Sequence, residues 1–161
     1  MRITNATIYS LAAEIRAGLS TAGLGPDDAL ATEVKIGFNE GDVLSHLPTV
    51  AVDEASNQGF PIGLGPQHIG AGRSIDIAIH VWGHNRLQAR ELADTIWEIC
   101  LFKDSIATFQ IKDYGQNPPI QIATGQTSLD ENGSLVPGPE DGTEGYARYV
   151  VVVPVLTHQP G

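Results

Sequence analysis

The stretch "SIDIAIHVWGHN", residues 74–85, decides the fold that the sequence predicts. Along it, apolar residues alternate with polar or small ones, which is typical of a β-strand that buries one face. The apolar parity consists of Ile75, Ile77, Ile79 and Val81. Gly83 and Asn85 follow, and an asparagine side chain can accept hydrogen bonds from the free backbone N–H groups at the start of a helix. The stretch therefore predicts a strand with a buried isoleucine face that runs directly into a helix.

Two segments have the spacing of amphipathic helices. From Thr4 to Ala22, and again from Asn85 to Leu101, apolar residues recur at steps of three and four. The apolar stripes consist of Ile8, Leu11, Ala12, Ile15 and Leu19 in the first segment and of Leu87 or Ala89, Leu92, Ala93, Ile96, Trp97 and Cys100 in the second. Each stripe can cover one face of a sheet.

Further segments have the composition of β-strands. They are "TEVKIGF" (32–38), "LPTVAVD" (47–53), "IATFQIKD" (106–113), "PPIQIATG" (118–125) and "YARYVVVVPVL" (146–156). The first two are short and close together, so we expect them to be antiparallel neighbours. Pro154 has no N–H to donate, and we expect it to weaken the pairing of the last strand.

Two segments rich in Gly, Pro and acidic residues are predicted to be long loops, at about 54–73 and about 125–145. The order of elements predicts a single domain over residues 1–161. Its predicted class is α+β, with a mainly antiparallel sheet of about four to six strands and both helices packed on one face.

The charge distribution argues against a protein that grips nucleic acid. The formal net charge is −10, and no Lys or Arg lies between Lys35 and Arg73 or from Asp113 to Ala147. Binding through phosphates needs basic clusters, whereas a negative wall lets DNA pass without holding it. No apolar run approaches the roughly 20 residues that span a bilayer, so we expect no membrane contact.

His80 and His84 are the sharpest candidates for a metal site. On a straight strand, residues four apart lie about 13 Å from each other, too far to share one ion. Asp76 is the nearest candidate for a third ligand. We interpret His80 as an outward polar residue and His84 as a turn residue, and we expect no metal.

Other possible chemistry has an ordinary structural explanation. Cys100 lies on the buried stripe of the second helix, where a cysteine behaves as a small apolar residue. The glycines of "GLGPQHIGAGRS" precede a strand, whereas a nucleotide loop precedes a helix. We interpret this segment as a contact loop with Arg73 as its anchor. No catalytic residue, cofactor or enzymatic activity is expected.

The sequence resembles a family of virion proteins. A first helix, an "LPTVAV" strand, a loop and then "SIDIAIHVWGHNRLQARELADTIWEI" together resemble the tail terminator, or tail completion, proteins of long-tailed bacteriophages. The resemblance covers about Thr4 to Leu101, the strand at 146–156 is compatible with it, and the acidic segment 126–145 lies outside it. It implies a hexameric ring that ends tail-tube polymerisation and joins the tube to the neck beneath the head.

This family function implies several partners and a location. The partners are further copies of the chain, the tail tube protein and a head-closure or connector protein, while genomic DNA passes through the lumen without specific binding. The protein is made in the host cytoplasm and ends in the virion, in the neck region of the tail. A head-to-tail ring needs two different patches on each subunit. The residues we expect at such interfaces are Phe60, Ile62, Leu64, His68, Arg73, His80, Trp82, Leu135 and Val136.

Trp82 has a special place in this set. It lies on the parity opposite the isoleucines, so we expect it to be exposed if the helices cover the isoleucine face, and an exposed tryptophan is a favoured interface anchor. Two alternatives remain open: a head-completion or neck adaptor on the portal side, and a small metal-dependent hydrolase that uses His80 and His84.

Overall fold

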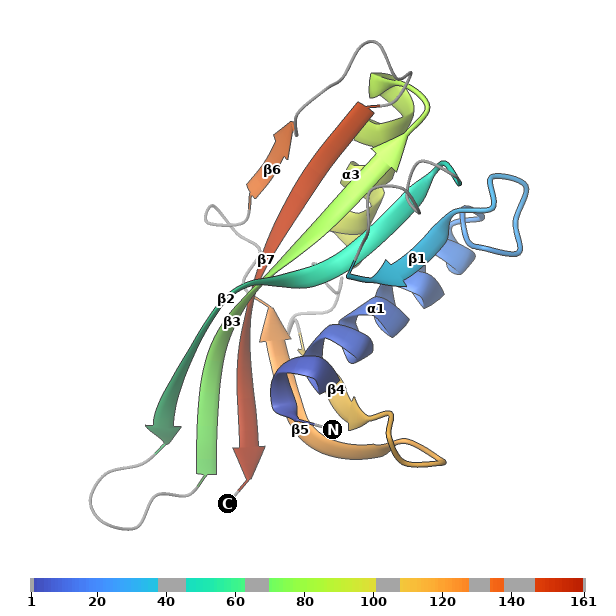
Figure 1. Ribbon diagram of the computed structural model, residues 1–161. Coiled ribbons are helices and arrows are strands. Elements are labelled where there is room, and N and C mark those ends of the chain that lie inside the picture. Colours follow the sequence, from blue (N-terminus) through green and yellow to red (C-terminus); the bar gives the residue numbers. More distant parts are fainter. Residues whose placement is uncertain are drawn as a thin grey trace.

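The computed structural model describes residues 2–37, 46–62, 70–100, 108–127, 134–137 and 147–160 (Figure 1). For residues 56–62, 70–72, 134–137 and 159–160, only the backbone is described. The elements in chain order are α1 (Ile3–Thr21), β1 (Glu33–Ile36), β2 (Thr49–Ile62), β3 (Gly70–Gly83), α3 (Arg86–Cys100), β4 (Thr108–Asp113), β5 (Ile120–Thr127), β6 (Ser134–Pro137) and β7 (Ala147–Pro160). The two predicted helices and the central strand are all present.

The strands form one sheet in the order β1-β2-β3-β7-β5-β4, and β6 adds a seventh strand by pairing with β7. Every pair is antiparallel except β1 with β2. β2, β3 and β7 run side by side as long curved strands, and β5 and β4 bend around the start of α1 (Figure 1). The predicted α+β class with a mainly antiparallel sheet is confirmed.

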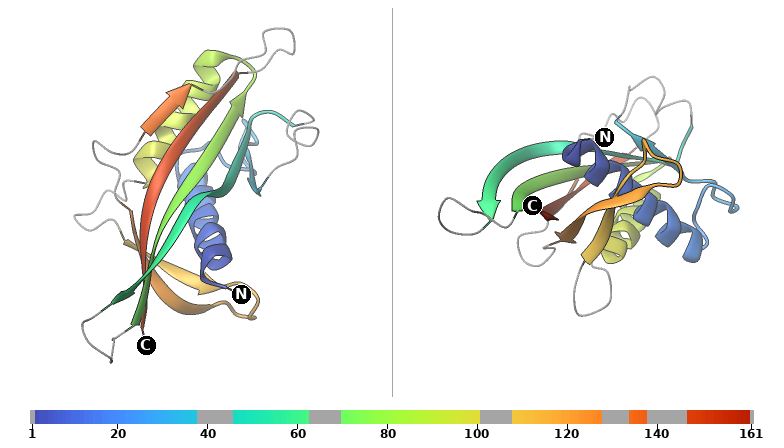
Figure 2. Two further views of the ribbon diagram at one scale, coloured as in Figure 1. Left: turned by 60° about the vertical axis from the view of Figure 1, so that its left-hand side comes forward. Right: turned by 90° about the horizontal axis from the view of Figure 1, so that it is seen from below.

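Both helices lie on the same side of the sheet, as predicted (Figure 2). The isoleucine parity of β3 is fully buried beneath them, together with Val151, Val153 and Val155 of β7. A hydrogen bond of 2.9 Å from the backbone N–H of Lys112 to Ser10 Oγ ties β4 to α1. The core therefore lies between one face of the sheet and the two helices.

The predicted loop at 54–73 is wrong, because most of this segment is a long hairpin. β2 continues to Ile62 and β3 begins at Gly70, with one register shift between Glu54 and Ser56. Along this length β3 also pairs with β7, from Gly70 opposite Pro160 onward. The ladder on both sides of β3 supplies backbone hydrogen bonds that outweigh the poor strand preference of Gly and Pro.

The second predicted loop, at 125–145, also contains strand. β5 extends to Thr127, and residues 134–137 form β6 against β7. Residues 128–133 and 138–146 lie outside the described part of the chain.

The expected antiparallel pairing of the first two strands is wrong as well. β1 runs parallel to β2, with Val34 opposite Val50. Residues 37–48 connect the two strands. A parallel pair needs a connection of about this length, because the chain must return to the end of the sheet where the first strand began.

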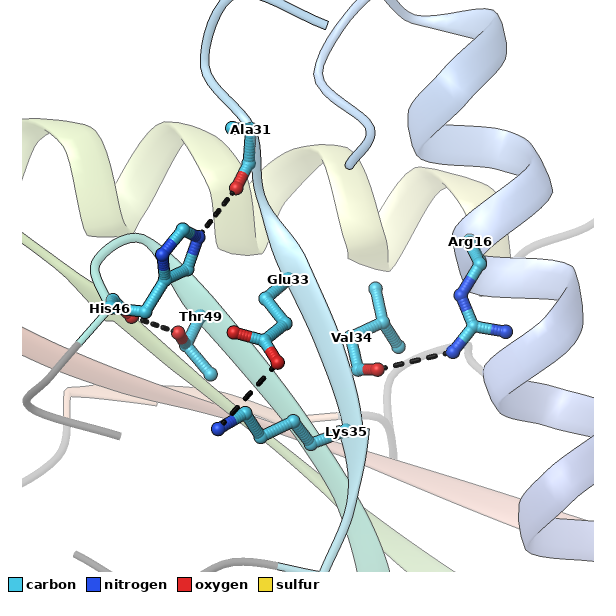
Figure 3. Close-up of polar contacts among 7 residues, drawn as sticks. All are labelled: Arg16, Ala31, Glu33, Val34, Lys35, His46 and Thr49. Carbon is cyan, nitrogen blue, oxygen red and sulfur yellow. Dashed lines mark hydrogen bonds and ion pairs between the residues drawn. The ribbon is translucent and has the colours of Figure 1, made fainter. Parts of the chain in front are cut away.

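β1 is an edge strand of the sheet, and polar contacts hold it there (Figure 3). Arg16 Nη2 on α1 donates to the carbonyl of Val34 at 3.1 Å, and a ring nitrogen of His46 lies 2.9 Å from the carbonyl of Ala31. Thr49 Oγ1 donates to the carbonyl of His46. These contacts tie β1 to α1 and tie the end of the connection to the residues before β1, which local sequence cannot indicate.

Pro154 does not weaken the strand as expected, because β7 stays paired with β3 from Ala147 to Pro160. On the other side of β7, the pairing with β6 ends at Val152 and the pairing with β5 starts at Val155. Pro154 thus lies in the gap between two partner strands, where fewer backbone donors are needed.

Candidate interaction surface

The sheet has a second face, directed away from the helices, which we call the open face. It is formed by Ala51 of β2, by Ala78, His80 and Trp82 of β3, and by Arg148, Val150, Val152, Pro154 and Leu156 of β7. In the described ranges, no helix covers these residues. Ala51, Ala78 and Trp82 are nevertheless buried, so the accessible part of the open face consists of His80 and the residues of β7. A sheet normally needs an apolar layer on each apolar face, so the open face is a candidate interaction surface.

An aromatic and cationic stack lies at one end of the open face. Trp82 is opposite Arg148 of β7 in the ladder. The guanidinium carbon of Arg148 lies 5.1 Å from the centroid of the Trp82 ring, and the His80 ring stacks on the same tryptophan at 5.7 Å and 25°. Arg148 Nη2 also donates to Nδ1 of His80. A cation over an aromatic face and a charge-assisted hydrogen bond stabilise one arrangement of the three side chains.

The predicted exposure of Trp82 is wrong, although its parity is right. Trp82 lies on the open face as expected, yet only 4% of its surface is exposed. Arg148 and His80 lie over the ring, and Leu47 and Ala51 pack against it. Trp82 is therefore the base of the stack, and its covering side chains present the contact surface.

The stack keeps His80 neutral. Burial, followed by the nearby charge of Arg148, lowers the pKa of His80 to about 4 against an opposing effect of Asp53. Because Nδ1 accepts from Arg148, the ring carries its proton on Nε2. At neutral pH the uncharged imidazole accepts a hydrogen bond from Arg148 and stacks on Trp82.

His80 and His84, the candidates for a metal site, have different surroundings in the structure. His80 belongs to the stack, whereas His84 is an exposed residue of the turn before α3. In the part of the chain that the structure describes, no group of three or more His, Cys, Asp or Glu residues could hold a metal ion. Cys100 is fully buried, and burial raises the pKa of its thiol to about 12, so the thiolate that a nucleophile needs is disfavoured.

The other predicted interface residues fall at separate places. Arg73 lies on β3, where its backbone N–H donates to Thr157 Oγ1 at 3.2 Å and its guanidinium lies 3.4 Å from Thr4 Oγ1 of α1. Trp82 follows Arg73 by nine residue steps along the strand, which corresponds to about 30 Å. The candidates thus belong to at least two regions of the sheet and do not form one site.

The remaining candidates are placed only by their backbones or lie outside the described residues. Phe60 and Ile62 pair with β3 at the end of the hairpin that lies far from the stack. Val136 pairs with Val150 and Leu135 with Val151, which puts β6 beside the strand that carries the open face. Leu64 and His68 lie outside the described residues.

Sequence reasoning missed the contribution of β7. The apolar run of residues 150–155 suits an interior position in the sheet, and β7 does lie between β3 and β5, but on the open face Val150, Val152 and Pro154 are only partly buried and 47% of Leu156 is exposed. The available signal was Arg148, a charged residue on the same parity as Val150 and Val152. It becomes informative only once the helices are known to lie on the other face.

A second surface feature lies on the helix side. α1 and α3 leave an open groove of about 510 Å³ between them, with Ala17, Gly18 and Ile99 among its lining and Glu14 and Glu98 beside them. A Cβ at Gly18 would lie 2.7 Å from Ile99 Cγ1, so the glycine permits the close approach of the two helices. The groove is a mainly apolar concavity with acidic borders.

The comparisons with known proteins place the chain in no family. No family model matches it, and no curated protein matches it. Among solved structures, a chain of the virion of a native gene transfer agent particle is similar over 93% of this chain and 96% of that chain, with a TM-score of 0.47 and 13% sequence identity. A similarity of this size assigns neither family nor function. In the described ranges, no helix is long and apolar enough to cross a membrane.

Proposed function

We propose that the chain is a structural protein of a phage-like virion that forms a ring at the head-proximal end of the tail tube. There it ends tube polymerisation and offers the docking surface for the neck. It acts through contacts with other proteins and catalyses no reaction. The ring is hexameric, the resident partners are the tube protein and a head-closure or connector protein, and the location is the neck region of the tail.

The open face is the observation that carries this proposal. A face with partly buried valines, an exposed Leu156 and an ordered arginine stack has the mixture of apolar area and polar groups found at protein interfaces. Arg and aromatic residues are also those that most often dominate binding energy. Neighbouring protein in an assembly would complete the layer that the described chain lacks on this side.

The charge and the sequence pattern support the more specific role. The net charge of −10 suits a channel through which DNA slides without sticking. Residues 74–100 form a strand, a turn and a helix, and the resemblance to tail terminators rests mainly on this segment. Two contacts of His80 speak against the alternative of a metal-dependent hydrolase: its Nδ1 accepts from Arg148 and its ring stacks on Trp82.

Deletion of the gene from a phage genome tests the role. We expect overlong tails or tails without heads, because tube growth would lack its stop and its docking surface. Pull-down of purified tube protein and of purified portal protein separates the terminator from a neck adaptor. Capture of the tube protein supports the terminator, and capture of the portal protein alone would assign the chain to the portal side.

A further inference from the structure

The stack on the open face contains one side chain whose contacts depend on its protonation. Neutral His80 accepts a hydrogen bond at Nδ1 from Arg148 Nη2, and its ring stacks on Trp82. An imidazolium carries a proton on both ring nitrogens and has no acceptor left. Protonation of His80 therefore removes the hydrogen bond that positions Arg148.

Protonation also brings two cations onto one aromatic ring. The guanidinium carbon of Arg148 lies 5.1 Å from the centroid of the Trp82 ring, and the centroid of the His80 ring lies 5.7 Å from it. Two like charges at such distances repel each other, and the repulsion is stronger at a partly buried site than in water. Arg148 is only partly buried, so its long side chain can carry the charge into the solvent.

A carboxylate on the neighbouring strand can receive the protonated ring. Ala51 of β2 is opposite His80 in the ladder, and Asp53 follows two residues later on the same face. The charge of Asp53 favours the protonated form of His80, in opposition to Arg148. When His80 is charged, Asp53 is therefore its favourable partner and Arg148 its unfavourable one.

The other titratable side chains near the stack are less well placed to act on His80. Asp76 lies on β3 itself, four residues before His80, which corresponds to about 13 Å. The segment that carries Leu47 also carries His46, and a ring nitrogen of His46 lies 2.9 Å from the carbonyl of Ala31. β6, which pairs with β7, has no titratable residue.

The position of Arg148 decides whether Trp82 is covered. Only 4% of the tryptophan is exposed, and its cover consists of the apolar Leu47 and Ala51 together with His80 and Arg148. Protonation leaves the apolar contacts unchanged and displaces the arginine. An uncovered tryptophan on the open face is a residue type that often dominates the binding energy of protein contacts.

We propose that His80 is an acid-operated latch: protonation passes its ring from Arg148 to Asp53, releases Arg148 and uncovers Trp82. With the latch closed, the open face presents His80 and the residues of β7. With the latch open, it presents the tryptophan as well, so the contacts that this face can make depend on pH. The latch is a property of the single chain and does not rest on the proposed ring.

The direction of the pH dependence follows from the contacts. In the closed arrangement, burial and then the charge of Arg148 lower the pKa of His80 from 6.5 to about 4. Release of Arg148 removes one of these effects and weakens the other, so the pKa is higher in the open arrangement. Proton uptake therefore favours opening, and the transition falls between pH 6.5 and pH 4.

Fluorescence of Trp82 tests the latch. The chain has two tryptophans, so Trp97→Phe leaves Trp82 as the only one. As the pH falls from 6.5 to 4, we expect the emission of this parent variant to shift to longer wavelength and its quenching by acrylamide to increase. The far-ultraviolet circular dichroism should stay constant over the same range, because only side chains move.

Variants in the Trp97→Phe background identify the group that titrates. His80→Gln keeps an acceptor for Arg148 but has no titrating ring, so its emission and quenching should stay constant. Asp53→Asn removes the receiving carboxylate and should move the midpoint of the transition to lower pH. His84→Gln, at the exposed turn, is the matched control and should leave the midpoint where it is.

Three results would overturn the latch. The first is constant emission and quenching in the parent variant, and the second is an equal change in His80→Gln. The third is a change that occurs only together with loss of the circular dichroism signal, since it would report unfolding of the whole chain. If His80→Gln does not fold, Asp53→Asn decides, and an unchanged midpoint in that variant would overturn the transfer to Asp53.

Discussion

His80 shows how one side chain can couple the stability of the stack to pH. Its ordinary pKa of 6.5 falls to about 4 in the folded protein. Between these values the unfolded chain binds the proton and the folded chain does not, so protonation favours unfolding. Above pH 6.5 His80 is neutral in both states and does not lower the free energy of unfolding. As the pH falls from 6.5 toward 4, the unfolded chain takes up the proton and the free energy of unfolding decreases.

Urea denaturation at a series of pH values between 7.5 and 4 tests this. We expect the free energy of unfolding to fall by about 1–2 kcal/mol from His80 alone, with allowance for solvent screening of a half-buried ring. His80→Gln should flatten that part of the profile, while His84→Gln at the exposed turn should leave it unchanged. Equal profiles for the wild type and His80→Gln would show that His80 does not titrate in the predicted way.

The start of α3 depends on reciprocal capping. Asn85 Oδ1 accepts from the backbone N–H of Gln88 at 2.9 Å, and Gln88 Oε1 accepts from the backbone N–H of His84 at 2.7 Å. Asn85→Ala removes the first bond and is expected to cost about 1 kcal/mol of unfolding free energy, whereas Asn85→Asp keeps an acceptor and should cost less. Thermal denaturation followed by circular dichroism measures both. If Asn85→Asp is as destabilising as Asn85→Ala, capping is not the cause.

The hairpin of β4 and β5 depends on a pairing of glycine with an aromatic residue. Gly125 lies opposite Phe109, and a Cβ at position 125 would lie 2.6 Å from Cε1 and 2.7 Å from Cζ of that ring. Gly125→Ala is expected to destabilise the protein by about 1–3 kcal/mol through overpacking. Phe109→Leu removes these ring atoms, so the cost of Gly125→Ala should be smaller in its presence. Additive effects in chemical denaturation would argue against the clash.

At the scale of the whole molecule, locally encoded features were predictable. The alternation of residues 75–81 and the stripes of the two helices follow from burial on one face, and each lies within one short segment. The cap at Asn85 was predictable for the same reason.

Other features depend on residues far apart in sequence and could not be predicted. The extension of β3 to Gly70 relies on pairing with β7, Trp82 is covered by Arg148, and β1 takes its parallel direction from contacts with α1 and β2. The groove requires the relative placement of α1 and α3. The candidate site was thus predicted at His80 and Trp82, and missed at β7 and between the helices.

The negative charge has a consequence for the assembled ring. If DNA passes through its centre, acidic residues should line the lumen, because attraction to phosphates at each subunit would hold the DNA in place. A map of the ring measures this directly. Acidic residues that all face outward around a basic lumen would contradict the proposed passage of DNA.

The central claim is that the chain ends a tail tube by forming a ring. Electron microscopy of the purified protein mixed with purified tail tubes tests it most directly. We predict ring-shaped density at one end of each tube, with a fixed number of subunits. Tubes whose two ends remain bare and alike, together with absence of the protein from purified virions, would contradict it.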